Sequence, residues 1–190
     1  MDRWTLVILA VFVEGGLALA AWLLGWLFGV PTWQAIRWDL DGIVWGLAVT
    51  GPMVVGLVAV VRWPVGPLAR IKRFSDEVVR PIFAPCTLLE LGLICVLAGL
   101  GEELFFRALL QTAFSGLWGP WVGGPAAAAI FGLLHMITPT YAVLAAGMGV
   151  YLGCAWLATG NLLAVVVAHA AYDFIALVYL VRVADGPVEK

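Results

Sequence analysis

Residues 86–114 read CTLLELGLICVLAGLGEELFFRALLQTAF, a long apolar run that carries two adjacent glutamates and an arginine in its interior. A helix needs about 20 predominantly apolar residues to cross the hydrocarbon core of a bilayer, and this run is long enough. The apolar residues are continuous, whereas the strands of a membrane barrel alternate apolar and polar residues over about ten positions. The stretch therefore predicts a membrane-spanning helix that holds ionisable groups inside the membrane.

The rest of the chain has the same character. Of its 190 residues, 64% are hydrophobic and 12% are charged, whereas a soluble domain has about 45–50% apolar and about 25% charged residues. The mean hydropathy is +1.05. A net charge of −2 offers no basic surface to nucleic acid, so we exclude that class of partner. The composition predicts an integral membrane protein whose surroundings are the lipid bilayer.

Working outward from residues 86–114, we count five more apolar runs of membrane-spanning character. Short connections separate the last four runs, so these should pack as antiparallel neighbours. The predicted fold is all-α, a polytopic membrane bundle of about six transmembrane helices. The predicted spans are residues 5–30, 43–61, 86–114, 121–137, 140–158 and 162–181.

Lys and Arg residues in the short loops predict the orientation. Residues 62–80 contain five Lys or Arg against two Asp or Glu, whereas the loop 31–42 contains Arg37 with Asp39 and Asp41. The basic segment is expected in the cytoplasm, which places both termini there. Within it, residues 68–74 can form an amphipathic helix lying on the anionic inner leaflet.

Charged side chains inside the predicted spans suggest chemistry. Each carboxylate or guanidinium near a helix centre costs about 2.5–3.5 kcal/mol on insertion scales, so such groups must face one another or water. Glu103 and Arg107 are four residues apart, lie on one helix face and can pair. Glu102 points about 100° away and stays free. A carboxylate in a low-dielectric pocket can take a proton from water, so Glu102 is a candidate general base.

Both histidines of the chain also lie within predicted spans. His135 follows Phe131 by one helical turn, and His169 precedes Asp173 by one turn. No Ser or Cys stands in a nucleophile arrangement with a His and a carboxylate, so an activated water is the better candidate. Glu102, His135 and His169 also provide the oxygen and two nitrogens of a catalytic zinc site, although the H-E-x-x-H spacing is lacking.

Three short motifs occur in order, each on its own predicted span: E-E-x-x-x-R at 102–107, F-x-x-x-H at 131–135 and H-x-x-x-D at 169–173. Together they resemble the CPBP family of intramembrane proteases, also called the type II CAAX-protease or ABI family. The resemblance covers about residues 86–181. It divides the chain into two N-terminal spans with the basic segment (1–85), a catalytic core of four spans (86–182) and a short polar tail (183–190).

The resemblance implies an intramembrane endopeptidase with Glu102 as general base, His135 holding the attacking water, and His169 and Asp173 as the oxyanion hole. The supporting residues would be Glu103, Arg107 and Phe131. The family usually has Asn at the last position, with Asp as an accepted variant. An ionised Asp would repel an oxyanion, so we predict that Asp173 is neutral or pairs with a cation such as protonated His169.

The same resemblance favours a glutamic-type protease without a cofactor over a zinc enzyme. The expected partner is a membrane-embedded or lipid-anchored protein or peptide, and the expected location is a bacterial inner membrane. One alternative is a non-catalytic scaffold or bacteriocin-immunity protein with the same fold. Another is a proton or ion relay, which also uses buried Glu, His and Asp, although no inverted repeat relates the two halves of the chain.

Counting from the span ends places Glu102 in the outer half of the membrane and His135 in the inner half. A single site therefore requires tilted helices or irregular helix ends.

Overall fold

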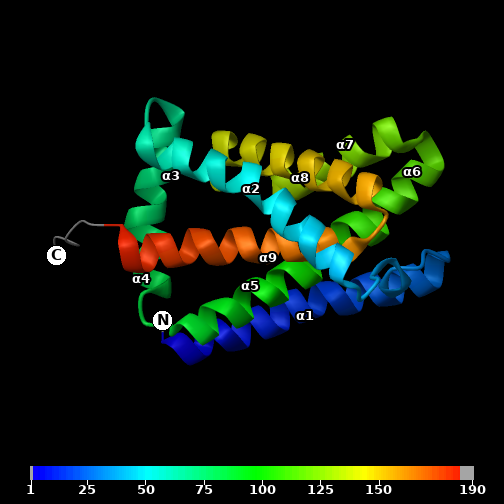
Figure 1. The fold of residues 1–190 in the computed structure, drawn as a ribbon, viewed down its shortest axis with the longest axis horizontal. Coiled ribbons are helices and arrows are strands. Elements are labelled where there is room, and N and C mark those ends of the chain that lie inside the picture. The colour runs from blue at the N-terminus through cyan, green and yellow to red at the C-terminus, as the bar shows by residue number, and fades with distance from the viewer. Residues whose placement is uncertain (1, 185–190) are drawn as a thin grey trace.

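The computed structural model describes residues 2–184 and, within that range, contains helices and no strand (Figure 1). This confirms the predicted all-α class. The longer helices are α1 (Arg3–Phe28), α2 (Leu40–Arg62), α5 (Leu88–Glu103), α7 (Pro120–Leu134), α8 (Pro139–Thr159) and α9 (Leu162–Val178). The shorter ones are η1 (Trp33–Ala35), α3 (Pro67–Phe74), η2 (Ser75–Val79), α4 (Arg80–Phe83), η3 (Leu104–Gln111), α6 (Thr112–Trp118) and η4 (Tyr179–Val183). Residues 185–190 of the predicted polar tail lie outside the described residues.

All six predicted spans are helical, but they differ in length. Within the described residues, four helices are long and apolar enough to cross a membrane: α1, α2, α8 and α9 with its extension to Val183. The helical stretch Leu88–Trp118 gives a fifth when it is combined with Pro67–Phe83, from which it is bent by 114°. Helix α7 has 15 residues, or about 22 Å, which is shorter than the hydrocarbon core of about 30 Å. The bundle therefore has four or five candidate spans and one shorter apolar helix.

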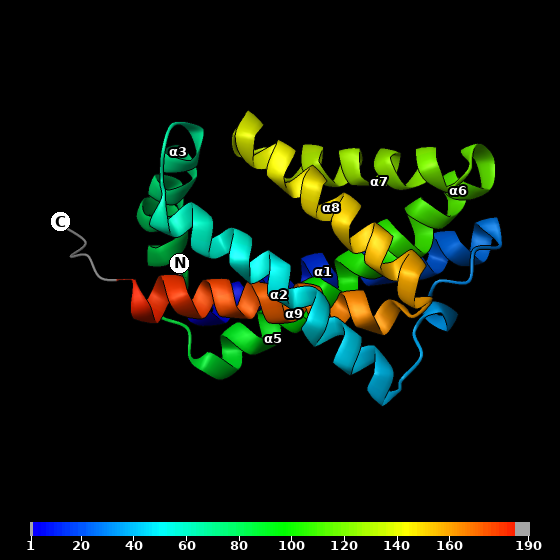
Figure 2. The same cartoon turned by 45° about the horizontal axis from the view of Figure 1, so that its top comes forward.

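Helix α9 runs through the middle of the bundle (Figures 1 and 2). It packs against α2 on one side and α5 on the other, while α1 covers α5 and α7 packs against α8. Its first turns are enclosed on all sides, since Leu162, Ala164 and Val165 have no exposed surface. The apolar first turns of α9 thus form part of the core, and the residues farther along α9 reach the middle of the bundle.

A tight turn at Gly160 and Asn161 joins α8 to α9. Gly160 ends α8 with φ 58°, a left-handed conformation that favours glycine. The side chain of Asn161 caps α9 by accepting from the backbone N–H of Leu163. It also donates to the carbonyl of Arg37 and to Asp39 Oδ1. This one amide therefore fastens the loop between α1 and α2 to the start of the central helix.

The amphipathic helix predicted at residues 68–74 is present as α3. Ile71 is buried on one side of it, while Arg70 and Arg73 are exposed on the other. In Figure 1, α3 lies at the same end of the bundle as the N-terminus and the end of η4. The basic segment and both ends of the described chain therefore share one end of the molecule.

Close packing between α1 and α5 depends on a missing side chain at Gly101. A methyl group at this position would lie 2.4 Å from the backbone oxygen of Glu14. Overpacking of this kind costs about 1–3 kcal/mol, so Gly101→Ala should lower the thermal unfolding temperature of the detergent-solubilised protein. Gly51→Ala in α2 is the matched control, because nothing lies within 4 Å of the added methyl group. Equal unfolding temperatures of the two variants would contradict the packing of α1 on α5.

Candidate active site

The ionisable residues of the three motifs come from four helical segments that meet in the interior. Glu102 and Glu103 end α5, and Arg107 lies in η3, the π-helical segment that continues it. His135 follows the end of α7, and His169 lies on α9. π-helical turns are rare and often occur at functional sites. Here the irregular segment follows the glutamate pair directly, and η3 also packs against α7 and α1.

Glu103 and Arg107 form the expected ion pair. Arg107 Nη1 lies 3.1 Å from Glu103 Oε1, and the two side chains are 2% and 0% exposed. The guanidinium also donates to the carbonyl of Gly149 at 3.4 Å and lies over the Phe131 ring, 4.7 Å from its centroid. The charge of Glu103 is thus balanced by a neighbour one turn away, and Arg107 connects η3 to α7 and α8.

A contact that the sequence did not predict joins Glu103 to His169. Glu103 Oε1 lies 2.7 Å from His169 Nδ1. The second ring nitrogen, Nε2, lies 3.4 Å from Asp173 Oδ2. The imidazole is therefore held between two carboxyl groups, one on α5 and one on its own helix. A protonated His169 would donate to both, as the expected pairing with Asp173 requires.

Glu102 points away from the ion pair, toward both histidines. Its Oε1 lies 3.8 Å from His135 Nε2, and its Oε2 lies 3.8 Å from His169 Nε2. These distances are too long for direct hydrogen bonds. Polar groups at such separations are commonly bridged by a water. Glu102 Oε2 is buried without a hydrogen-bond partner, so this carboxylate has an unused acceptor.

His135 lies one residue beyond α7, which corrects the expectation that it sits within a span. The helix ends at Leu134, and the His135 backbone at φ −96° and ψ 17° leaves the helical conformation. Its Nδ1 lies 2.8 Å from the carbonyl oxygen of Phe131, and a carbonyl only accepts, so Nδ1 carries the proton of this bond. In a neutral ring, Nε2 is then the free acceptor, and it faces Glu102.

The short α7 resolves the conflict in depth between Glu102 and His135. Because α7 has only 15 residues and ends at Leu134, the turn after it places His135 Nε2 3.8 Å from Glu102 Oε1 near the end of α5. The irregular helix end that a single site required is therefore found at α7.

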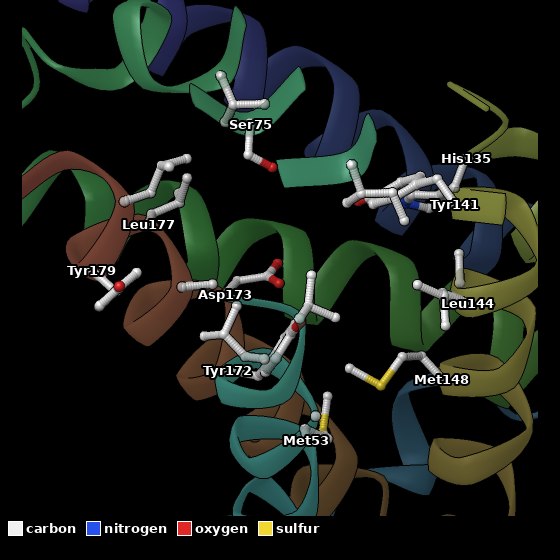
Figure 3. A pocket seen from close by; sticks show the side chains of 18 of the residues that line it. Met53, Ser75, His135, Tyr141, Leu144, Met148, Tyr172, Asp173, Leu177 and Tyr179 are labelled. Atoms are coloured by element: carbon white, nitrogen blue, oxygen red, sulfur yellow. The ribbon is translucent and has the colours of Figure 1, made fainter. Parts of the chain in front are cut away.

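Glu102, His135, His169 and Asp173 line one cavity of about 670 Å³. Its walls are mostly apolar and come from α2, α3, α5, α8 and α9. Figure 3 shows Asp173 pointing into the cavity, with His135 and Tyr141 on the opposite side. The polar end contains Glu102, His135, His169 and Asp173, and the apolar part extends past Met53 to Ile71 and Phe74. The shape suits a substrate with an apolar segment next to the reacting bond.

Sequence reasoning missed three further polar residues near the site. Glu14 on α1 interacts electrostatically with Glu102 and both histidines, and its Oε2 is buried without a hydrogen-bond partner. The insertion cost that singled out Glu102 applies equally to Glu14 and could have identified it. Tyr141 and Tyr172 line the cavity. Tyrosine is enriched at membrane–water interfaces, so its presence in these helices did not by itself indicate a site.

No group of three or more His, Cys, Asp or Glu residues is arranged to hold a metal ion in the part of the chain that the structure describes. Of the residues considered as zinc ligands, His169 has both ring nitrogens facing carboxyl groups other than Glu102 at shorter distances.

Residues 84–175 match the family model described as type II CAAX prenyl endopeptidase Rce1-like. No curated protein and no solved structure matched the chain. The matched residues are just under half of the chain, and they contain all three motifs, from Glu102 to Asp173. Helices α1, α2 and α3 lie outside the match. The match shows that residues 84–175 are similar to the Rce1-like family of CAAX-type proteases, and the long apolar helices identify the chain as an integral membrane protein.

Proposed function

We propose that this protein hydrolyses a peptide bond in a membrane-embedded or lipid-anchored protein or peptide, using a water activated by Glu102 and His135. The observation that carries the proposal is the position of the Glu102 carboxylate, 3.8 Å from an imidazole nitrogen of each histidine at the polar end of an apolar cavity. A water between these groups has two acceptors, the carboxylate and His135 Nε2. It needs both to be oriented and deprotonated.

In the proposed reaction the water oxygen bonds to the scissile carbonyl carbon while its proton passes to Glu102. The carbonyl π electrons move to oxygen and give a tetrahedral intermediate. When the C–N bond breaks, Glu102 returns the proton to the leaving amine, and the oxygen restores the carbonyl of the new carboxyl group. Protons and electrons balance without any other reactant.

The remaining motif residues position this machinery. Glu103 accepts from His169 Nδ1, and Arg107 holds Glu103 in turn. These contacts fix the imidazole so that Nε2 faces the cavity and Asp173. A protonated His169 would place positive charge where the oxyanion develops, an interaction that is often the largest catalytic contribution. Asp173 then acts as the partner of that cation and not as a donor itself.

The cavity wall indicates the chemical class of the substrate. Most of the cavity wall is apolar, so we infer a peptide whose scissile bond adjoins a lipid group or a hydrophobic helix. The exposed Arg70 and Arg73 on α3 support a cytoplasmic location for that end of the molecule and for both termini. A bacterial inner membrane fits this orientation.

The test uses the purified full-length protein in liposomes with an internally quenched, farnesylated CAAX peptide and a set of membrane-tethered reporter proteins. We expect cleavage of at least one probe, with an initial rate that a strong zinc chelator leaves unchanged. Loss of activity on chelation and recovery with added zinc would establish a metalloprotease instead. No cleavage of any probe, together with dissipation of an imposed pH gradient, would favour the relay. Binding without cleavage would favour the scaffold.

A further inference from the structure

The ring N–H groups of the two motif histidines face other groups of the protein and not the position of a substrate carbonyl. The Nδ1 hydrogen of His135 is used by the carbonyl of Phe131, 2.8 Å away. His169 faces Glu103 at 2.7 Å through Nδ1 and Asp173 at 3.4 Å through Nε2. An oxyanion that forms between Glu102 and Asp173 therefore lies next to two carboxyl groups, and a protonated His169 would offer it charge while its N–H groups face Glu103 and Asp173. A neutral donor that is not already used would stabilise it.

Tyr141 is a neutral donor in the right part of the cavity. It stands in the first turn of α8, on the side of the cavity that faces Asp173 (Figure 3). Its phenol lines the same cavity as Glu102 and Asp173 and interacts electrostatically with both. The hydroxyl has no hydrogen-bond partner among the described residues. A phenol donates one hydrogen and carries no charge near neutral pH.

The backbone holds Tyr141 in place. Thr138 caps α8 by accepting from the Tyr141 N–H at 3.1 Å, and Pro139 begins the helix. The same short connection carries His135, which presents its ring to Glu102. Residues 135–141 therefore bring a water-binding imidazole and a phenol to the cavity in one piece of chain. Preorganised donors of this kind need no rearrangement during the reaction.

We propose that the Tyr141 hydroxyl is a catalytic residue that donates a hydrogen bond to the scissile carbonyl oxygen as the tetrahedral intermediate forms. The proposal rests on the proposed function and adds a residue that none of the three motifs contains. Tyr141 keeps its proton throughout, so the hydrogen bond strengthens as negative charge develops on the oxygen and weakens when the carbonyl returns. Tyr172, which lines the same cavity and interacts electrostatically with Asp173 and Tyr141, is the alternative donor.

The experiment compares Tyr141→Phe, Tyr172→Phe and Tyr151→Phe with wild type in liposomes, using whichever probe the wild-type enzyme cleaves. We expect Tyr141→Phe to lower kcat about 100-fold, the usual effect of losing one oxyanion donor, with KM unchanged. Affinity for a phosphinate analogue of the cleaved peptide should fall in parallel, because its anionic oxygen mimics the intermediate. Tyr151→Phe controls for loss of a phenol on α8, since its hydroxyl donates to Val49 outside the cavity.

A wild-type kcat for Tyr141→Phe overturns the proposal while leaving the protease function standing, because the wild-type enzyme cleaves in the same assay. A rise in KM with kcat unchanged also overturns it and assigns Tyr141 to substrate binding. If Tyr172→Phe shows the loss instead, the donor is Tyr172. An inactive wild-type enzyme counts against the proposed function itself, which separates the two failures.

Discussion

Glu102→Gln is expected to abolish peptide cleavage while the protein still inserts and folds. The amide has nearly the same shape as the carboxylate but cannot take a proton from water. General-base catalysis contributes about 10²–10⁴-fold to rate, so the loss should be at least of that size. Structural damage should be small, because Glu102 makes no direct hydrogen bond and lies 3.8 Å from each histidine. Product formation from the farnesylated peptide in liposomes measures the effect.

His135→Ala should cause a comparable loss by removing the second acceptor for the water. Glu77→Gln is the matched control, because Glu77 is exposed in η2 and does not line the cavity. Wild-type activity of Glu102→Gln would show that another group deprotonates the water. Glu14 would then be the first carboxylate to consider, since it interacts electrostatically with Glu102 and both histidines.

Much of the fold could be read from the sequence because hydrophobicity determines membrane helices directly. Continuous apolar runs predicted the ends of α1, α2, α8 and α9 to within a few residues, and the basic segment predicted α3. The length of α7 was overestimated, because apolar residues continue past the helix end at Leu134. Periodicity does not reveal where an apolar helix stops when apolar residues continue through the following turn.

The sequence was enough to name the residues of the candidate site, but not to predict which of them are in contact. Helical spacing was enough to pair Glu103 with Arg107 and to turn Glu102 away from them, because both relations are local. The bond from Glu103 to His169 joins residues 66 positions apart and depends on how α5 packs on α9. Which helices pack together is a matter of tertiary structure, and the spacing of residues along one sequence does not predict it. The same holds for Tyr141, whose position depends on the short turn after α7.

Arg107→Met is expected to destabilise the protein more than any surface change, because it leaves the Glu103 carboxylate buried without its cation. Removing one partner of a buried ion pair costs about 3–5 kcal/mol, and both side chains are almost fully enclosed. Lys72→Gln provides the contrast. It breaks the Lys72–Asp76 pair, in which each side chain is 34% exposed, and such pairs contribute about 0–1 kcal/mol. Unfolding of the two variants in mixed micelles compares these costs.

The double variant Glu103→Leu with Arg107→Met separates stability from catalysis. Replacing a buried ion pair by apolar residues of similar volume is often neutral or stabilising, so most of the lost stability should return. Activity should not return, because His169 Nδ1 loses the acceptor that lies 2.7 Å away and its ring is no longer held against Asp173. A stable and fully active double variant would show that Glu103 is not needed to position His169. A stable but inactive double variant would mean that the role of the ion pair is to orient the His169 imidazole.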